Sequence, residues 1–208
     1  MAAKKRKQRR KPLFHFRRKA PEFRPDAEGS SLRKLLHFTR QQRTDVLRWV
    51  LYCAVCVLML LLQDVLMSRI AVLGATTDLA PAAILLIAVM ENCETGSLYA
   101  LIASLFYFFS GSAPEAYCVI LITVFGMFFS LFRQQYLHRS VGSVVVCAGA
   151  AQIGYELGLW GIGLFLGLTR FDRLGRFFLT GVYSAACMVP LYWIFNKIGT
   201  MGGRQWKE

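Results

Sequence analysis

Charged residues are scarce in most of this sequence. Only 18% of the 208 residues are Asp, Glu, Lys or Arg, whereas a soluble domain carries about 25%. The charges are also unevenly placed, because 16 of the 25 Lys and Arg but only four of the 12 acidic residues precede Leu51. The first 50 residues therefore carry a net charge of +12, and the remaining 158 carry +1. This distribution is typical of a membrane protein with a basic tail.

The sequence also lacks the residue patterns of a catalytic or metal centre. Its histidines, His15, His37 and His138, lie in the tail or in a polar loop, and no nucleotide-binding loop or Ser-His-Asp set is visible. Cys53 and Cys56 have the spacing of a metal or redox site, but a structural site needs four ligands and no second pair follows. We therefore expect no enzymatic activity, no cofactor and no metal.

Residues 1–46 are predicted to form a basic cytoplasmic tail. Residues 1–30 contain three prolines and no apolar period, which predicts disorder. From Ser31 onward, leucines at helical spacing lie among basic residues, which predicts an amphipathic helix on an anionic membrane surface. Nucleic-acid binding is not expected, because no aromatic residues interleave the run KKRKQRRK. The residues expected to bind anionic lipids are Lys4, Lys5, Arg6, Arg33, Lys34 and Arg43.

Six apolar runs follow the tail and predict an all-α integral membrane protein. They cover residues 47–67, 79–91, 96–110, 115–132, 141–168 and 177–196, within a membrane domain of residues 47–198 and before a cytoplasmic tail of residues 199–208. A helix needs about 20 residues to cross a hydrocarbon core of ~30 Å, and four runs approach that length. The short second and third runs are two spans, a re-entrant hairpin or one broken span. We favour two separate spans, because an even total number of spans returns the chain to the side of the membrane on which it starts.

The distribution of basic residues predicts the orientation of the spans. The positive-inside rule places the basic N-terminal tail in the cytoplasm. Six spans then return residues 133–139 and 197–207, which are also basic, to the cytoplasmic side. Arg170, Arg173 and Arg176 fall on the opposite side and disagree with the rule, although a short interfacial segment accounts for them.

Glu156 is the single charged residue in the run GAAQIGYELGLWGIGLFLGL. A carboxyl group at membrane depth is costly and is a candidate functional residue. Its face of the helix forms a proton or ligand site, a contact with a partner helix, or a neutral carboxyl hydrogen-bonded inside the bundle, and the last is favoured. That face carries Gln152, Tyr155, Glu156 and Trp160. The opposite side carries small residues that permit close helix packing, namely Ala150, Gly154 and Gly158.

Two further polar positions are predicted from helix signals. Asp78 precedes a helix with Pro81 in its first turn, which predicts an N-cap. Pro190 interrupts the last span and is expected to kink it. One face of that span is predicted to pack closely on another helix through Gly181, Ser184 and Ala185. Tyr183 and Pro190 are candidates for contact with a partner beside a groove.

The order of these features resembles one known family. The motifs are LLLQDVLMSRIAVLG, TTDLAPAAILLI, GSLYALIASLFYFFSGSAPEAY, VFGMFFSLFRQQYLHRS, the Tyr155-Glu156-Leu157 run and GVYSAACMVPLYWIF. In this order, over approximately residues 47–198, they resemble the rod shape-determining protein MreD family. The chain departs from the family at three places. Tyr107 and Phe108 stand where an Asp is frequent, Ser184 where an Asn is common, and Glu91 and Glu94 where basic residues are usual.

The resemblance implies a non-enzymatic component of the bacterial cell-elongation complex. Such a protein is a multi-pass protein of the inner (plasma) membrane with a cytoplasmic N-terminus. It binds the bitopic protein MreC and is linked through it to the MreB filament and the RodA–penicillin-binding-protein synthase. The family is also similar in fold to the S-components of energy-coupling-factor transporters, which implies a six-helix bundle. The alternative function is therefore a substrate-binding subunit of a vitamin or small-molecule transporter.

Overall fold

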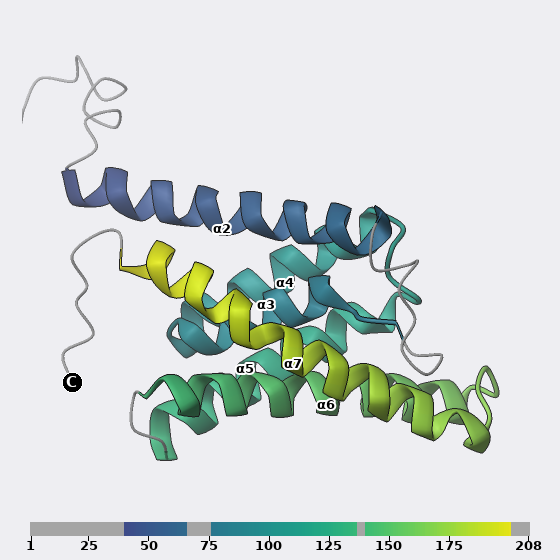
Figure 1. Ribbon diagram of the computed structural model, residues 1–208. Coiled ribbons are helices and arrows are strands. Elements are labelled where there is room, and N and C mark those ends of the chain that lie inside the picture. The colour runs from purple at the N-terminus through teal and green to yellow at the C-terminus, as the bar shows by residue number, and fades with distance from the viewer. Residues whose placement is uncertain (1–39, 66–75, 137–139, 201–208) are drawn as a thin grey trace, which may run out of the picture. The chain divides into compact units, whose positions relative to one another are not determined.

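The computed structural model of the chain describes residues 40–65, 76–136 and 140–200 (Figure 1). These residues form six α-helices and a short 3-10 helix, and no strand occurs among them. The predictions for residues 1–39 and 201–208, including lipid binding by Lys4, Lys5, Arg6, Arg33 and Lys34, lie outside the described residues. The elements are α2 (Arg40–Val65), α3 (Leu79–Met90), α4 (Cys93–Phe109), α5 (Tyr117–Tyr136), α6 (Val141–Phe165), η2 (Phe171–Arg173) and α7 (Leu174–Gly199).

Four of these helices are long and apolar enough to cross a membrane. The candidate spans are Arg43–Val65, Tyr117–Tyr136, Val141–Phe165 and Phe171–Gly199. Their outer faces are apolar, as Val146, Phe165 and Trp193 show with 70%, 89% and 68% of their surfaces exposed. The prediction of an all-α chain with membrane-spanning helices is therefore confirmed for the described residues. Helix α2 begins at Arg40 and continues unbroken into the first span, with Arg43 exposed near its start.

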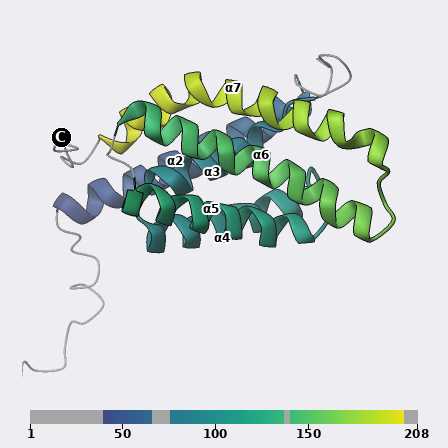
Figure 2. The same cartoon turned by 90° about the horizontal axis from the view of Figure 1, so that it is seen from below.

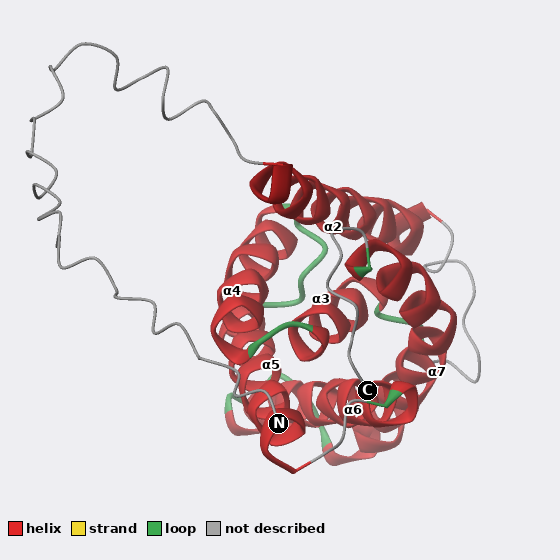
Figure 3. Cartoon of the chain, turned by 90° about the vertical axis from the view of Figure 1, so that its left-hand side faces the viewer, coloured by secondary structure: helices red, strands yellow, loops and turns green. Residues whose placement is uncertain are grey.

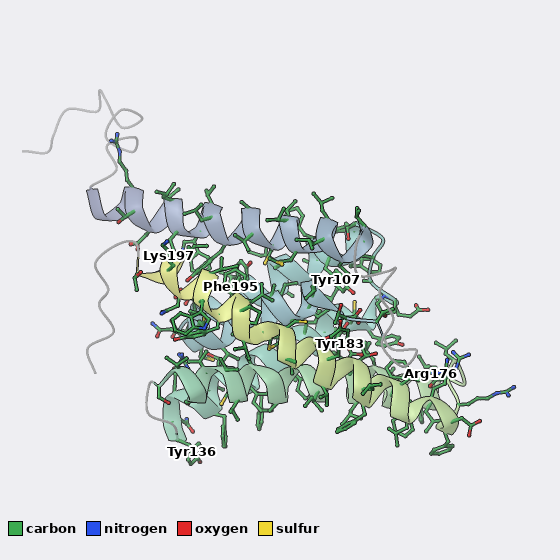
Figure 4. The ribbon with its side chains drawn as sticks, viewed as in Figure 1. Tyr107, Tyr136, Arg176, Tyr183, Phe195 and Lys197 are labelled. Carbon is green, nitrogen blue, oxygen red and sulfur yellow. The ribbon has the colours of Figure 1, made fainter. Side chains whose placement is uncertain are left out.

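The helices run alternately between two ends of the bundle. Figure 4 places Tyr136 of α5 and Lys197 of α7 at one end, where α2 also begins (Figure 1). We call this the tail end. Arg176, at the start of α7, lies at the opposite end, which we call the far end (Figure 4). The described chain therefore returns to its starting end after α7, as an even number of crossings requires.

Helix α3 is the centre of the bundle. Its sequence, LAPAAILLIAVM, has no polar side, and all 12 of its residues are buried. The other five helices surround it in the order α2, α4, α5, α6 and α7, and each of them packs against it (Figures 2 and 3). A helix of 12 residues is about 18 Å long, which is much shorter than a hydrocarbon core of ~30 Å. Both ends of α3 therefore lie inside the bundle.

A short turn at Glu91 and Asn92 reverses the chain between α3 and α4. The two helices pack so closely after this turn that a Cβ atom added at Gly96 would clash with the backbone carbonyl of Ala88. Backbone atoms cannot rotate out of the way as a flexible side chain does, so glycine is required at this position. The short second and third apolar runs are therefore two separate antiparallel helices.

Helix α6 packs against α5 through two of the predicted small residues. A Cβ atom at Gly154 would lie 2.8 Å from the ring of Phe125, and one at Gly158 would lie 3.2 Å from Leu121. Ala150 does not join this contact: it is exposed, since no described side chain of a neighbouring helix covers its single methyl group.

Helix α6 packs against α7 through a second set of small residues. A Cβ atom at Gly149 would touch Ala185 at 3.4 Å, and one at Gly181 would lie 3.2 Å from the Cα atom of Ile153 and 3.3 Å from the Cγ atom of Glu156. Glu156 thus faces α7 and the centre of the bundle, on a different side from the contact with α5. Helix α7 continues through Pro190, which is exposed.

The contact at Gly96 makes a testable prediction about stability. We expect Gly96→Ala to destabilise the folded protein by about 1–3 kcal/mol, the usual cost of overpacking, because the new methyl group pushes α4 away from α3. Gly161→Ala is the matched control, since nothing lies within 4 Å of a Cβ atom at Gly161 in α6. Thermal unfolding in detergent measures both. Equal melting temperatures for the two variants would contradict the close α3–α4 packing.

Candidate functional site

The N-terminal end of α3 meets polar side chains from two distant helices. The backbone N–H of Asp78 donates to the hydroxyl of Ser184 in α7 at 2.9 Å, and the N–H of Ala80 donates to Oε1 of Gln63 in α2 at 2.8 Å. Pro81 has no N–H to satisfy. The first turn of a buried helix normally needs a capping partner for such donors. Here the caps come from α2 and α7, so they also fix these helices around α3.

Asp78 occupies the predicted N-cap position, but its side chain makes no capping hydrogen bond. The carboxyl group of Asp78 instead lies within hydrogen-bonding reach of the carboxyl group of Glu156 in α6. Gln152, one turn earlier on α6, donates from Nε2 to Oε1 of Glu156 at 3.1 Å. Glu156 is 1% exposed and Gln152 is fully buried. The structure therefore brings the two predicted polar residues together and adds Asp78 to them.

Two tyrosines enclose this carboxyl pair. Tyr107 of α4 is 1% exposed and hydrogen-bonds to Gln63, and its hydroxyl is close enough to Asp78 and Glu156 to interact with them electrostatically. Tyr155 of α6 is fully buried and interacts electrostatically with the same two carboxyl groups. Figure 4 shows Tyr107 toward the far end of the bundle. We call these residues the far-end cluster: Gln63, Asp78, Tyr107, Gln152, Tyr155, Glu156 and Ser184.

Three buried polar atoms near the far-end cluster have no hydrogen-bond partner among the described residues. They are Oε1 of Gln152, the hydroxyl of Tyr155 and Oγ1 of Thr77. Native proteins leave few such atoms unpaired, because each costs free energy when it is buried without a partner. Several unpaired oxygens leave hydrogen-bonding positions that a small polar ligand, a water molecule or a proton carrier could occupy.

The remaining predicted polar or partner-facing residues lie elsewhere. The ring of Trp160 packs edge-on against Phe171, with 5.8 Å between the ring centroids, and its Nε1 has no described partner. Tyr183 is partly buried on α7, and Pro190 is exposed. No contact in the described residues joins these three side chains to the far-end cluster.

The C-terminal end of α3 has a polar cluster of its own, which the sequence reasoning missed. Glu91 caps α3, and its carboxylate accepts hydrogen bonds from Arg48 at 3.1 Å and from the hydroxyl of Tyr52 at 3.3 Å. Its backbone carbonyl accepts from Arg133 at 3.3 Å and from Ser130 at 3.4 Å. We call Arg48, Tyr52, Glu91, Ser130 and Arg133 the tail-end cluster. It joins α2, α3 and α5.

The charges of the two clusters match the dipole of α3. A helix has partial positive charge at its N-terminus and partial negative charge at its C-terminus. Asp78 and Glu156 lie at the N-terminus of α3, and two arginines lie at its C-terminus against a single carboxylate. Both ends are thus electrostatically favourable. No group of three or more His, Cys, Asp or Glu residues that could hold a metal occurs among the described residues.

A mostly apolar groove lies between α2 and α4, with α3 as its floor. Its volume is about 530 Å³, and Cys53 and Cys56 both face it. Cys56 also contacts the hydroxyl of Tyr99, with 2.8 Å between sulfur and oxygen. We call it the α2–α4 groove; its lining residues are Trp49, Cys53, Cys56, Val57, Leu60, Ala80, Ile84, Thr95, Leu98, Tyr99, Ile102, Ala103 and Phe106. No residue of α7 lines it, so the groove expected beside Pro190 stays a prediction.

Comparison of the chain with protein-family models, curated proteins and solved structures finds no match.

The tail-end cluster makes a testable prediction. We expect Glu91→Ala to destabilise the protein by about 3–5 kcal/mol, because it leaves the buried guanidinium of Arg48 without its carboxylate. Glu94→Ala is the matched control, since Glu94 is exposed two residues after the same turn. Thermal unfolding in detergent measures both variants.

A third variant separates the loss of the ion pair from the loss of packing. Replacing both partners, in Arg48→Met with Glu91→Leu, should recover part of the lost stability, because an apolar pair leaves no unpaired charge. A single Glu91→Ala variant as stable as Glu94→Ala would contradict the assigned ion pair.

Proposed function

We propose that this chain is a non-enzymatic scaffold of the bacterial cell-elongation complex, which organises lateral peptidoglycan synthesis and regulates cell shape. The observation that carries the proposal is the convergence of its motifs. Gln63, Asp78 and Glu156 come from three different motifs through which the chain resembles the MreD family, and they meet in the far-end cluster. Tyr107 and Ser184, which stand where the chain departs from the family, complete the cluster. Residues separated by more than 100 positions thus form one structural unit.

The bonding within the cluster supports a scaffold more than an enzyme. Most of its polar groups are hydrogen-bonded to each other or to the backbone of α3, and these contacts join α2, α6 and α7 to the central helix. A catalytic site would need a nucleophile or a proton-transfer group directed at an open substrate cavity. The α2–α4 groove is lined mainly by carbon atoms and offers binding without chemistry.

We further propose that the α2–α4 groove receives the membrane-spanning helix of an MreC-like bitopic protein. Along α2, the lining extends from Trp49 to Leu60, about 16 Å or three helical turns. Small residues such as Cys53 and Ala103 let a helix approach closely, and Leu98, Ile102 and Phe106 are exposed to meet it. Through that partner the chain is linked to the MreB filament and the RodA–penicillin-binding-protein synthase.

The proposed location follows from the same assignment. Four apolar spans place the chain in a membrane, and we assign it to the inner (plasma) membrane with a cytoplasmic N-terminus. The tail end of the bundle then faces the cytoplasm, where the strongly basic N-terminal residues meet anionic lipids. The far end faces the outside of the cell.

The unpaired oxygens of the far-end cluster favour a second candidate function. A substrate-binding subunit of a vitamin or small-molecule transporter, similar in fold to the S-components of energy-coupling-factor transporters, would use Gln152, Tyr155 and Glu156 to hold a polar ligand. Saturable binding of such a ligand by the purified protein, lost in Glu156→Ala, is required by this alternative.

Site-specific photo-crosslinking in cells tests the proposed partner. We expect a photoreactive residue at Ile102, in the α2–α4 groove, to capture an MreC-like bitopic protein that mass spectrometry identifies. The same residue at Val146 is the control, because Val146 is 70% exposed on α6 and outside the groove. Capture at both positions, or at neither, would contradict the groove assignment. Recovery of an ATPase and a transmembrane coupling subunit instead would support transport.

A further inference from the structure

The carboxyl groups of Asp78 and Glu156 are hydrogen-bonded to each other. An ionised carboxylate accepts hydrogen bonds but cannot donate one, so a bond between two carboxyl groups needs a proton on one of them. This observation does not depend on the function proposed above.

No cation among the described residues faces the pair. From α2 it meets the amide of Gln63, which caps α3; from α4 the hydroxyl of Tyr107; and from α7 the hydroxyl of Ser184. Helix α6 contributes Gln152 and Tyr155, and Cys118 of α5 lies close to both tyrosines. Two carboxylates in one site repel each other strongly without a cation to separate them. The pair therefore favours the form that keeps one proton and one negative charge.

The negative charge that remains is also accounted for. Asp78 stands at the N-terminus of α3, where the helix dipole favours a negative charge. The buried and unpaired Oε1 of Gln152 and hydroxyl of Tyr155 provide two further hydrogen-bonding positions beside the pair. A water molecule bonded there would carry a proton to and from the carboxyl groups.

Access to the pair is one-sided. Asp78 is partly exposed and Thr76 is exposed, so the pair is nearest to solvent at the far end. Toward the tail end, the pair is closed off by α3, whose central residues from Leu85 to Val89 are fully buried apolar side chains. We therefore expect the pair to exchange its proton at the far end.

We propose that Asp78 and Glu156 form a proton-binding site, in which one exchangeable proton from the far side of the membrane bridges the two carboxyl groups and fastens α3 to α6. Removing this proton leaves two carboxylates that repel each other and weakens the contact between α3 and α6. The stability of the bundle therefore falls as the pH on the far side rises through the range in which the proton leaves. At lower pH, while one proton remains on the pair, the contact between α3 and α6 is kept.

Infrared spectroscopy of the full chain in lipid nanodiscs tests for the proton. The expected result is a carbonyl band of a protonated carboxyl group, which shifts in Asp78→Asn and disappears in the double variant Asp78→Asn with Glu156→Gln. Asp64→Asn is the control, because Asp64 accepts a hydrogen bond from Ser112 at the exposed far end, and it should leave the band unchanged. A band that survives the double variant, or that Asp78→Asn does not move, would overturn the proposal.

Thermal unfolding across a pH series gives the second readout. The melting temperature of the unmodified chain should fall from mildly acidic to alkaline buffer. In Glu156→Gln much of this dependence should vanish, because the side-chain amide introduced by the substitution donates to the Asp78 carboxylate at every pH. Equal pH dependence in the two proteins would overturn the proposal. The unmodified chain alone suffices if a variant fails to fold, since a melting temperature independent of pH would overturn it as well.

Discussion

The fold depends on how the two ends of α3 are satisfied. In lipid, an apolar side chain gains little from moving out of contact with acyl chains and into contact with other side chains. The apolar body of α3 therefore does not by itself hold this helix at the centre of the bundle. Its backbone ends are different, because unpaired N–H and C=O groups cost several kcal/mol each inside a membrane. A helix of 12 residues is too short to bring both ends to water, so the protein must pair them internally.

Each end recruits the helices that surround it. At the far end, Gln63 and Ser184 cap the first turn and so tie α2 and α7 to α3, while Glu156 ties α6 through Asp78. At the tail end, Glu91 draws in Arg48 of α2 and Arg133 of α5. Helix α4 is held against α3 in a different way, by the close backbone approach at Gly96. All five outer helices are thus positioned by contacts with the central one, and small residues on α6 complete the contacts among them.

The sequence predicted the helices well because hydropathy is a local property. The six apolar runs correspond to α2 through α7. Glu156 is predicted as a buried carboxyl from its surroundings on one helix, and Gln152 as a residue of the same face from the spacing of one turn; the two are hydrogen-bonded. Such inferences need only the periodicity of a helix.

The partners that come from other helices were not predicted. Asp78 was assigned as a conventional cap, although its side chain bonds to Glu156, 78 residues away. Glu91 lies in the turn between α3 and α4, but its ion pair with Arg48 was not predicted. Both partners were missed for one reason: which helices become neighbours, and in which register, is set by the packing of the whole bundle. Ala150 fails for the same reason, since a small residue at the right spacing is exposed if no helix packs over it.

Hydrogen exchange of the backbone amides, measured by mass spectrometry on the chain in nanodiscs, tests the central role of α3 most directly. If both ends of α3 are paired inside the bundle, the amides of Leu79–Met90, first turn included, should exchange more slowly than those of the exposed Asp45, Val46 and Leu47 in α2. Replacing Ser184 with Ala should accelerate exchange at Asp78 and not at Glu91. Exchange of the first turn of α3 as fast as that of α2, or no change in the variant, would contradict the account.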